Sequence, residues 1–112
     1  MVSRRFGRIA NITSVSIPSP VTNLELSTAA RMALTGFVVS VSREAAQHNV
    51  AINNLLPGTI MTDRLRELGP VAEALIASVP AGRAGTPAEF GAACAFLCSE
   101  AAGFYRRSEF IY

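Results

Sequence analysis

The sequence contains no lysine, because all ten of its basic residues are arginine. Tyrosine is nearly absent as well, since the two tyrosines, Tyr105 and Tyr112, both stand at the very end of the chain. The scarcity of these two residue types therefore excludes any mechanism in which this chain supplies a lysine, or a tyrosine from the body of the chain. Charge is also scarce: 16% of residues are charged and the net charge is +2. A charge this small and this dispersed gives no nucleic-acid-binding footprint.

Long hydrophobic runs are missing too. No apolar run approaches the roughly 18 residues that cross a bilayer, so we expect no membrane partner. The first residues, MVSRRFG, lack the apolar stretch of a secretory signal, which favours a cytoplasmic location. Cys94 and Cys98 stand four residues apart in an apolar helical pattern, and buried thiols in a reducing compartment are the simplest interpretation. A disulfide or half of a metal site is the alternative, and we predict no metal centre.

Length and hydrophobicity indicate one small domain of the α/β class. The chain has 112 residues, half of them hydrophobic. The apolar run at residues 8–13 is predicted to be a strand, and residues 14–20, rich in serine and proline, a loop. A helix is predicted over residues 23–47, capped by Thr22 or Asn23, and a second strand over residues 50–56. Strand, helix and strand in this order predict a parallel βαβ unit.

The helix over residues 23–47 carries one continuous apolar face. Its members recur at spacings of three and four: Leu26, Ala29, Ala30, Ala33, Phe37, Val41 and Ala45. His48 follows the helix and is interpreted as a C-terminal cap rather than a catalytic base.

Three further helical pieces are predicted. The first runs over residues 63–67 after an Asp63 cap, the second over residues 71–78 and the third over residues 86–99. Proline at the first position and an acidic residue in the first turn favour the start of the third. Residues 63–78 carry apolar side chains that either line a binding site or pack in the core. These side chains are Leu65, Leu68, Val71, Leu75 and Ile76.

The most informative segment is NNLLPGTIMTD at residues 53–63. Its apolar strand ends at Pro57-Gly58, because proline cannot continue a central ladder and glycine permits a sharp exit. Ligands of open α/β sheets bind beyond such carboxyl ends. The pattern N-x-x-x-P-G-x-x-x-T resembles the segment after the sixth strand of the short-chain dehydrogenase/reductases. This resemblance implies that Pro57, Gly58, Ile60 and Thr62 face a nicotinamide cofactor, NAD or NADP. A plain turn capped by Thr62 or Asp63 is the alternative. The resemblance also implies that residues 63–78 form a lid over the substrate, and their apolar side chains hint at a hydrophobic substrate.

The sequence GRIANITS at residues 7–14 places Ser14 at the carboxyl end of the first strand. The family resemblance implies that Ser14 hydrogen-bonds the substrate carbonyl, and the alternative is a loop serine that bonds its own backbone. In that family a tyrosine and, four residues later, a lysine stand near the start of the long helix. The segment LSTAARMALTGF at residues 26–37 aligns without gaps and places Ser27 at the tyrosine and Arg31 at the lysine.

These two replacements remove the family's usual proton relay. A serine hydroxyl is a far weaker acid than a phenol. Arginine keeps the positive charge and can bond a ribose hydroxyl, but its planar guanidinium has a different geometry. The chain is therefore interpreted as an atypical branch that uses another proton donor, or as a non-catalytic relative.

The resemblance covers only the C-terminal half of the family's domain. Residues 82–90, GRAGTPAEF, resemble the stretch before its last large helix and are interpreted as structural, with an Arg83 ion pair. No G-x-x-x-G-x-G or G-x-G-x-x-G occurs, so residues 1–112 are expected to form a partial dinucleotide-binding domain without its Gly-rich half. The match ends near Phe104, as a shifted reading frame or altered terminus would produce. The expected fold is the C-terminal half of a Rossmann-like doubly wound parallel sheet, a βαβ unit plus two or three helices.

Three functions remain open. The first is part of an NAD(P)-dependent oxidoreductase that acts on a small carbonyl or alcohol substrate and is inactive as this chain alone. The second is a non-catalytic interaction module, forming a homo-oligomer through the helix at residues 23–47. The third is a truncated gene product without a function, and exposed sheet edges favour aggregation in that case.

Overall fold

The computed structural model describes residues 1–19, 21–105 and 109–111. Their secondary structure is an α/β arrangement built on a three-stranded sheet with the order β1-β2-β3. Strand β1 is Gly7–Ile12, β2 is Val50–Leu56 and β3 is Glu109–Ile111, and both pairings are parallel. Because β1 and β2 pair in register from Gly7 with Val50 onward, their carboxyl ends lie at the same edge of the sheet. The predicted βαβ unit is confirmed.

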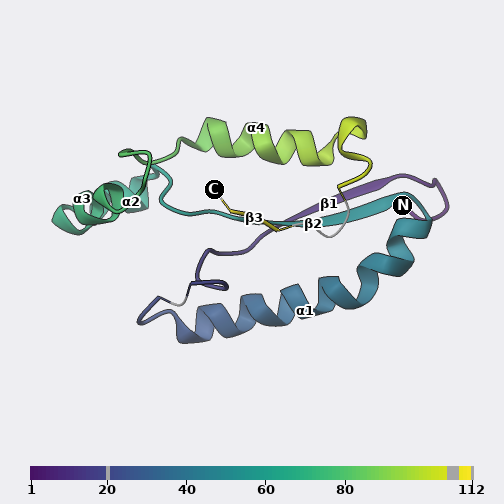
Figure 1. Ribbon diagram of the computed structural model, residues 1–112, viewed down its shortest axis with the longest axis horizontal. Coiled ribbons are helices and arrows are strands. Elements are labelled where there is room, and N and C mark those ends of the chain that lie inside the picture. The colour runs from purple at the N-terminus through teal and green to yellow at the C-terminus, as the bar shows by residue number, and fades with distance from the viewer. Residues whose placement is uncertain (20, 106–108, 112) are drawn as a thin grey trace.

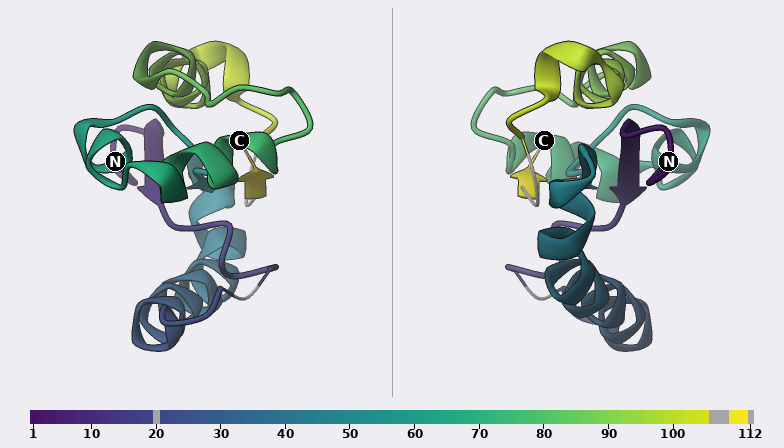
Figure 2. Two further views of the ribbon diagram at one scale, coloured as in Figure 1. Left: turned by 90° about the vertical axis from the view of Figure 1, so that its left-hand side faces the viewer. Right: turned by 90° about the vertical axis from the view of Figure 1, so that its right-hand side faces the viewer.

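The helices form a layer on each face of the sheet (Figure 1). Helix α1, Glu25–Gln47, lies on one face and α4, Pro87–Cys98, on the other. The short helices α2, Asp63–Glu67, and α3, Pro70–Ala77, lie beyond the carboxyl end of β2. The side views in Figure 2 show the same order of helix, sheet and helix. Such helix layers explain why β2 is buried along its whole length.

The described residues bury apolar side chains in two regions. The sheet contributes Leu55 and Leu56, which are both fully buried, and Val38 of α1 and Leu97 of α4 are buried on its two sides. A separate small cluster joins α2 and α3 to the segment before α4, through Leu65, Ala72 and Ala84, with Met61 and Ile76 packed against them. This second cluster fixes the helices beyond the strand ends, where ligands of α/β folds bind.

The buried face of α1 differs from the apolar face expected from the sequence. Leu26 is 89% exposed and Phe37 is 61% exposed, whereas Val38 and Ser42 are buried. Figure 1 shows the reason, because α1 diverges from the sheet toward its N-terminal end and contacts it mainly through its C-terminal part. The expected apolar face therefore lies largely in solvent, and a mixed polar and apolar face points toward the sheet.

The start of α1 also corrects the sequence interpretation. Leu24 occupies the N-cap position without a side-chain cap, so neither Thr22 nor Asn23 caps the helix. Asn23 has a φ of 66°, and its N–H donates instead to the Glu25 carboxylate at 3.0 Å. Asparagine tolerates this left-handed conformation better than most residues, which explains the choice at a sharp helix entry. At the other end His48 is the C-cap, as expected.

Candidate functional site

Two cavities open beside the carboxyl ends of β1 and β2. The larger has a volume of about 660 Å³ and the smaller about 360 Å³, both within the range of small-molecule sites. They share one wall, made by Val15 after β1 and by residues 58–60 after β2. The smaller cavity brings together five of the residues singled out in the sequence: Ser14, Pro57, Gly58, Ile60 and Thr62.

Ser14 stands two residues beyond the end of β1 and is half-buried. Its hydroxyl oxygen accepts a hydrogen bond from the backbone N–H of Ser16 at 3.1 Å. A serine hydroxyl has two acceptor lone pairs and one hydrogen. The local turn therefore uses one acceptor site of Ser14, and its hydrogen stays available to a group in the cavity.

A backbone bridge joins the segment after β2 to Gly85, before α4. The Met61 N–H donates to the Gly85 carbonyl at 2.8 Å, and the Gly85 N–H donates to the Thr59 carbonyl at 3.0 Å. Within the part of the chain that the structure describes, the N–H groups of Gly58, Thr59 and Ile60 donate to no protein acceptor. The Thr62 hydroxyl oxygen caps α2 by accepting the Leu65 N–H at 3.3 Å, so its hydrogen is free to donate.

Ser27 and Arg31 lie on the sheet-facing side of α1 and bond to each other. The Arg31 guanidinium donates to the Ser27 hydroxyl and, at 3.3 Å, to the Ser27 carbonyl. It also donates, at 3.1 Å, to the carbonyl of Thr13, the residue directly before Ser14 in the chain. Neither Ser27 nor Arg31 lines the two cavities. Arg31 therefore fastens α1 to the loop that carries Ser14 rather than reaching the cavity itself.

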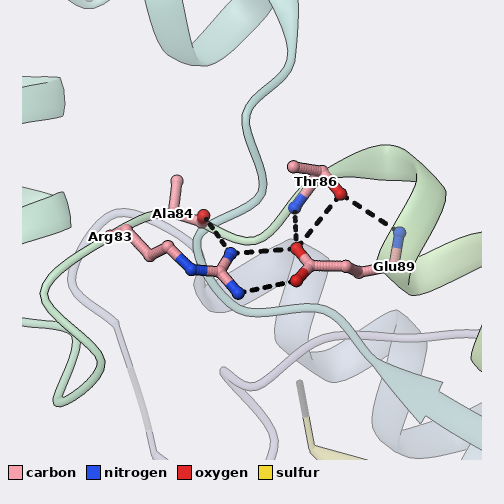
Figure 3. Close-up of polar contacts among 4 residues, drawn as sticks. All are labelled: Arg83, Ala84, Thr86 and Glu89. Atoms are coloured by element: carbon pink, nitrogen blue, oxygen red, sulfur yellow. Dashed lines mark hydrogen bonds and ion pairs between the residues drawn. The ribbon is translucent and has the colours of Figure 1, made fainter.

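Arg83, Thr86 and Glu89 form a polar network at the rim of the larger cavity (Figure 3). Arg83 donates to both carboxylate oxygens of Glu89, at 2.9 and 2.6 Å, which confirms the ion pair expected from the sequence. Glu89 also accepts the Thr86 N–H at 2.8 Å, and Thr86 accepts the Glu89 N–H at 3.1 Å, a capping box for α4. The hydrogen bonds from Arg83 and Thr86 lower the pKa of Glu89 from 4.5 to about 2.

Several cavity residues were not singled out as site residues from the sequence. The wall of the smaller cavity includes Val21 and Leu24 from the loop before α1, and Arg64 from α2. Of the predicted lid residues, Leu65, Leu68 and Leu75 line it, whereas Ile76 packs in the core cluster and Val71 is 58% exposed. Arg64 could have been suspected only from its position, because it is the second residue of α2 and so follows closely on the turn after β2.

The two cysteines lie on one face of α4, and both are free thiols. Cys94 is half-buried and Cys98 is exposed, so the expectation that both are buried is wrong. Although Cys98 is exposed overall, partial loss of hydration at its sulfur raises the pKa of the thiol, and the neighbouring Cys94 acts in the same direction. Across the residues described, no group of three His, Cys, Asp or Glu side chains is placed to hold a metal ion. No helix there is both long and apolar enough to cross a membrane.

Comparison with known sequences places these features in a family context. Residues 1–110 match the family described as enoyl-(acyl carrier protein) reductase. The chain is 33% identical over 111 residues to the acetoacetyl-CoA reductase of Cupriavidus necator, covering 98% of this chain and 45% of that protein. It is 38% identical over 105 residues to the 3-oxoacyl-[acyl-carrier-protein] reductase of Vibrio cholerae, covering 93% of this chain and 43% of that protein.

Solved structures give the same result. The crystal structure of a 3-oxoacyl-(acyl-carrier-protein) reductase from Agrobacterium tumefaciens with NADP bound superposes with a TM-score of 0.88 at 32% identity. It is covered over 45% of its length and this chain over 99%. An NADPH-dependent reductase involved in bacilysin biosynthesis superposes with a TM-score of 0.90 at 30% identity, covering 98% of this chain and 46% of that one. The chain therefore spans a little under half the length of these relatives.

Proposed function

Because this chain belongs to the short-chain dehydrogenase/reductase family, we propose that it forms the C-terminal half of an NAD(P)-dependent oxidoreductase domain. The reaction is hydride transfer between a nicotinamide cofactor and the carbon of a small carbonyl or alcohol substrate. The observation that carries this proposal is the smaller cavity, which gathers Ser14 with residues 57–62 at the carboxyl ends of two parallel strands. Ligands of open α/β sheets bind at that edge.

The residues after β2 fit the nicotinamide end of such a cofactor. Gly58, Thr59 and Ile60 present backbone N–H groups that have no acceptor in the described protein, and the Thr62 hydroxyl has a free hydrogen. A carboxamide oxygen accepts hydrogen bonds of this kind. When bound, the nicotinamide ring supplies or accepts the hydride. The Gly-rich loop that holds the pyrophosphate in dinucleotide sites is not among these 112 residues.

The remaining roles follow from the contacts of Ser14 and Arg31. Ser14 donates its hydrogen to the substrate oxygen as negative charge develops there. Arg31 is a positioning residue, because its guanidinium bonds the Thr13 carbonyl and so fixes the loop that carries Ser14. Neither Ser27 nor Arg31 serves as a proton donor at neutral pH, since a serine hydroxyl is a weak acid and arginine keeps its proton. A proton donor other than these two residues completes the alcohol.

These residues alone do not catalyse the reaction. The partial domain of residues 1–112 offers a site for one end of the dinucleotide, and the Gly-rich half has to come from other residues, on the same polypeptide or on a second one. We place the reaction in the cytoplasm, a proposal that the free thiols of Cys94 and Cys98 support.

The first experiment is capture of the native protein from its source, with an antibody to α1, followed by intact mass and NAD(P)H consumption on a panel of ketones. We expect a polypeptide of about twice this length, or a second chain that co-purifies, because relatives are about twice as long. In a recombinant copy of that complete protein, Ser14→Ala lowers the turnover by about 100-fold, as expected for loss of a donor to a developing oxyanion. Ser40→Ala, on the outer face of α1, leaves the turnover unchanged.

Capture of an 11.8 kDa chain with no partner and no NAD(P)H consumption would refute the reductase function. If the captured chain also aggregates, we would conclude that it is a truncated gene product without a function.

A second candidate function, a non-catalytic interaction module, is favoured by the outer face of α1. Leu26 is 89% exposed and Phe37 61% exposed on this face, and the alanines between them, Ala29, Ala30 and Ala33, are exposed as well. Apolar side chains grouped on one helix face are typical of an interface. Under this proposal the chain forms a homo-oligomer through α1. Sedimentation of the chain and of Phe37→Glu tests it: the variant is monomeric if the face pairs, and an unchanged sedimentation coefficient refutes the module.

A further inference from the structure

We propose that Arg64 makes the smaller cavity selective for an apolar substrate that carries a free carboxylate, an oxo acid rather than a neutral ketone or ester. This inference rests on the proposed reductase function and names the substrate class of the same site. Of the described residues on the cavity wall, Arg64 is the one that carries a charge. The roles proposed above for Ser14 and residues 57–62 do not involve this charge.

The positive charge of Arg64 has no partner on α2. The nearest carboxylate in sequence, Asp63, is engaged by Arg66, whose guanidinium contacts it at 2.5 Å. Among the residues that the structure describes, no hydrogen bond or ion pair involves the Arg64 side chain. Arg66 engages one of the two acidic residues of α2, Asp63, and the other, Glu67, makes no bond to Arg64 within the described structure, so the Arg64 guanidinium remains available to an anion in the cavity.

The rest of the wall defines what kind of anion fits. Apolar side chains from three segments line it: Val15, Val21, Leu24, Leu65, Leu68 and Leu75. A ligand that fills this wall needs an apolar body. One arginine balances one negative charge, and its planar fork matches a carboxylate with two parallel hydrogen bonds. Ser14 opens to the same cavity and can bond a carbonyl oxygen of the same molecule.

The chemistry of these groups therefore divides the substrate into three parts. Its carboxylate meets Arg64, its reacting carbonyl meets Ser14, and its hydrocarbon body covers the leucines and valines. A neutral molecule of equal length loses only the first contact, so the charge of the ligand isolates the role of Arg64.

The test compares octanoate with octanamide, its neutral counterpart of equal length, by titration of the ¹⁵N-labelled chain followed by NMR. We expect octanoate to bind about tenfold more tightly than octanamide, as for a charge-assisted pair at a partly exposed site. The preference decreases as salt is raised, because ions screen an exposed arginine. Signals of Ser14 and Thr62 shift with either ligand.

Two matched variants locate the effect. Arg64→Gln removes the preference for octanoate and leaves octanamide binding unchanged. Arg43→Gln, on the exposed surface of α1 and outside the cavity wall, leaves the preference intact. Far-UV circular dichroism of each variant checks that the fold is kept, and Arg64 is exposed, so its replacement does not disturb the core.

Equal binding of the two ligands by the unchanged chain, no binding of either, or a preference that survives Arg64→Gln would overturn the proposal. Octanoate binding needs no cofactor, so such a failure leaves the reductase function standing. Absence of hydride transfer in the captured native protein, with the octanoate preference retained, would refute the reductase function instead.

Discussion

Two leucine-to-alanine substitutions compare the stability contributed by a buried strand position with that contributed by an exposed helix position. Leu55 lies in the central strand β2 with no exposed surface, whereas Leu26 lies on the outer face of α1 and is 89% exposed. The same atoms are removed at both positions. Burial therefore accounts for most of the difference in the free energy of unfolding, because the helix and strand propensities of alanine contribute at most about 1 kcal/mol.

The expected magnitudes differ widely. Removing a buried leucine side chain costs about 2–5 kcal/mol, from lost transfer energy and the cavity left behind. A domain of this size has a free energy of unfolding on the order of 5–15 kcal/mol, so Leu55→Ala removes about a third of it. Leu26→Ala changes it by less than about 0.5 kcal/mol, as at other exposed positions.

Urea unfolding followed by far-UV circular dichroism is the suitable assay, because the chain has no tryptophan to report by fluorescence. With a slope of about 2 kcal/mol per molar urea, the midpoint falls by roughly 1–2.5 M for Leu55→Ala and by less than about 0.3 M for Leu26→Ala. Equal shifts for the two variants would refute the assignment of β2 to the core. A shift for Leu26→Ala that depends on protein concentration would show that the outer face of α1 is covered by another molecule.

Three further predictions concern α4, α1 and the turn before α4. Since Glu89 has its pKa lowered to about 2, its ionised form stabilises the fold above pH 4.5, and this contribution is lost as the pH falls from 4.5 toward 2. Glu89→Gln should therefore unfold at a lower temperature than the unchanged chain at neutral pH, and this difference should shrink as the pH falls from 4.5 toward 2. A difference that stays constant over that window contradicts this. Thr86→Ala removes the cap of α4 and lowers the free energy of unfolding by about 1 kcal/mol in the urea assay; no change would count against the capping box. Gly36→Ala meets no atom within 4 Å and stabilises α1 by about 0.5–1 kcal/mol, whereas Gly82→Ala, at a φ of 68°, destabilises by about 1–2 kcal/mol; shifts of the same sign refute the backbone argument.

The order of the main elements could be predicted because its signals are local. Proline and glycine end β2 at residues 57–58, and Thr86 with Pro87 begins α4, as the short-range geometry of these residues requires. The ion pair of Arg83 with Glu89 is also local, because the two side chains flank one turn. Such features depend on neighbours in the chain, so a single sequence contains them.

The candidate site could be predicted only in part. Ser14 and residues 57–62 follow two strand ends, and a parallel pair brings such ends together, so their shared cavity was foreseeable. Their roles toward a cofactor and a substrate stay predictions. Ser27 and Arg31 were expected beside them, yet Arg31 bonds the Thr13 carbonyl outside the cavity wall. Side-chain direction on a helix depends on how the helix is rotated against the sheet, and that rotation is a tertiary property.

The sequence by itself determined the parallel βαβ unit, the helix boundaries to within a few residues and the absence of the family's tyrosine and lysine, because these follow from residue types and their spacing. Only the tertiary structure decided which face of α1 packs. The helix diverges from the sheet, so Phe37 is exposed and Ser42 is buried. It also placed Arg64 on a cavity wall whose other described residues are uncharged. Both outcomes depend on contacts between segments far apart in the chain, which no local pattern encodes.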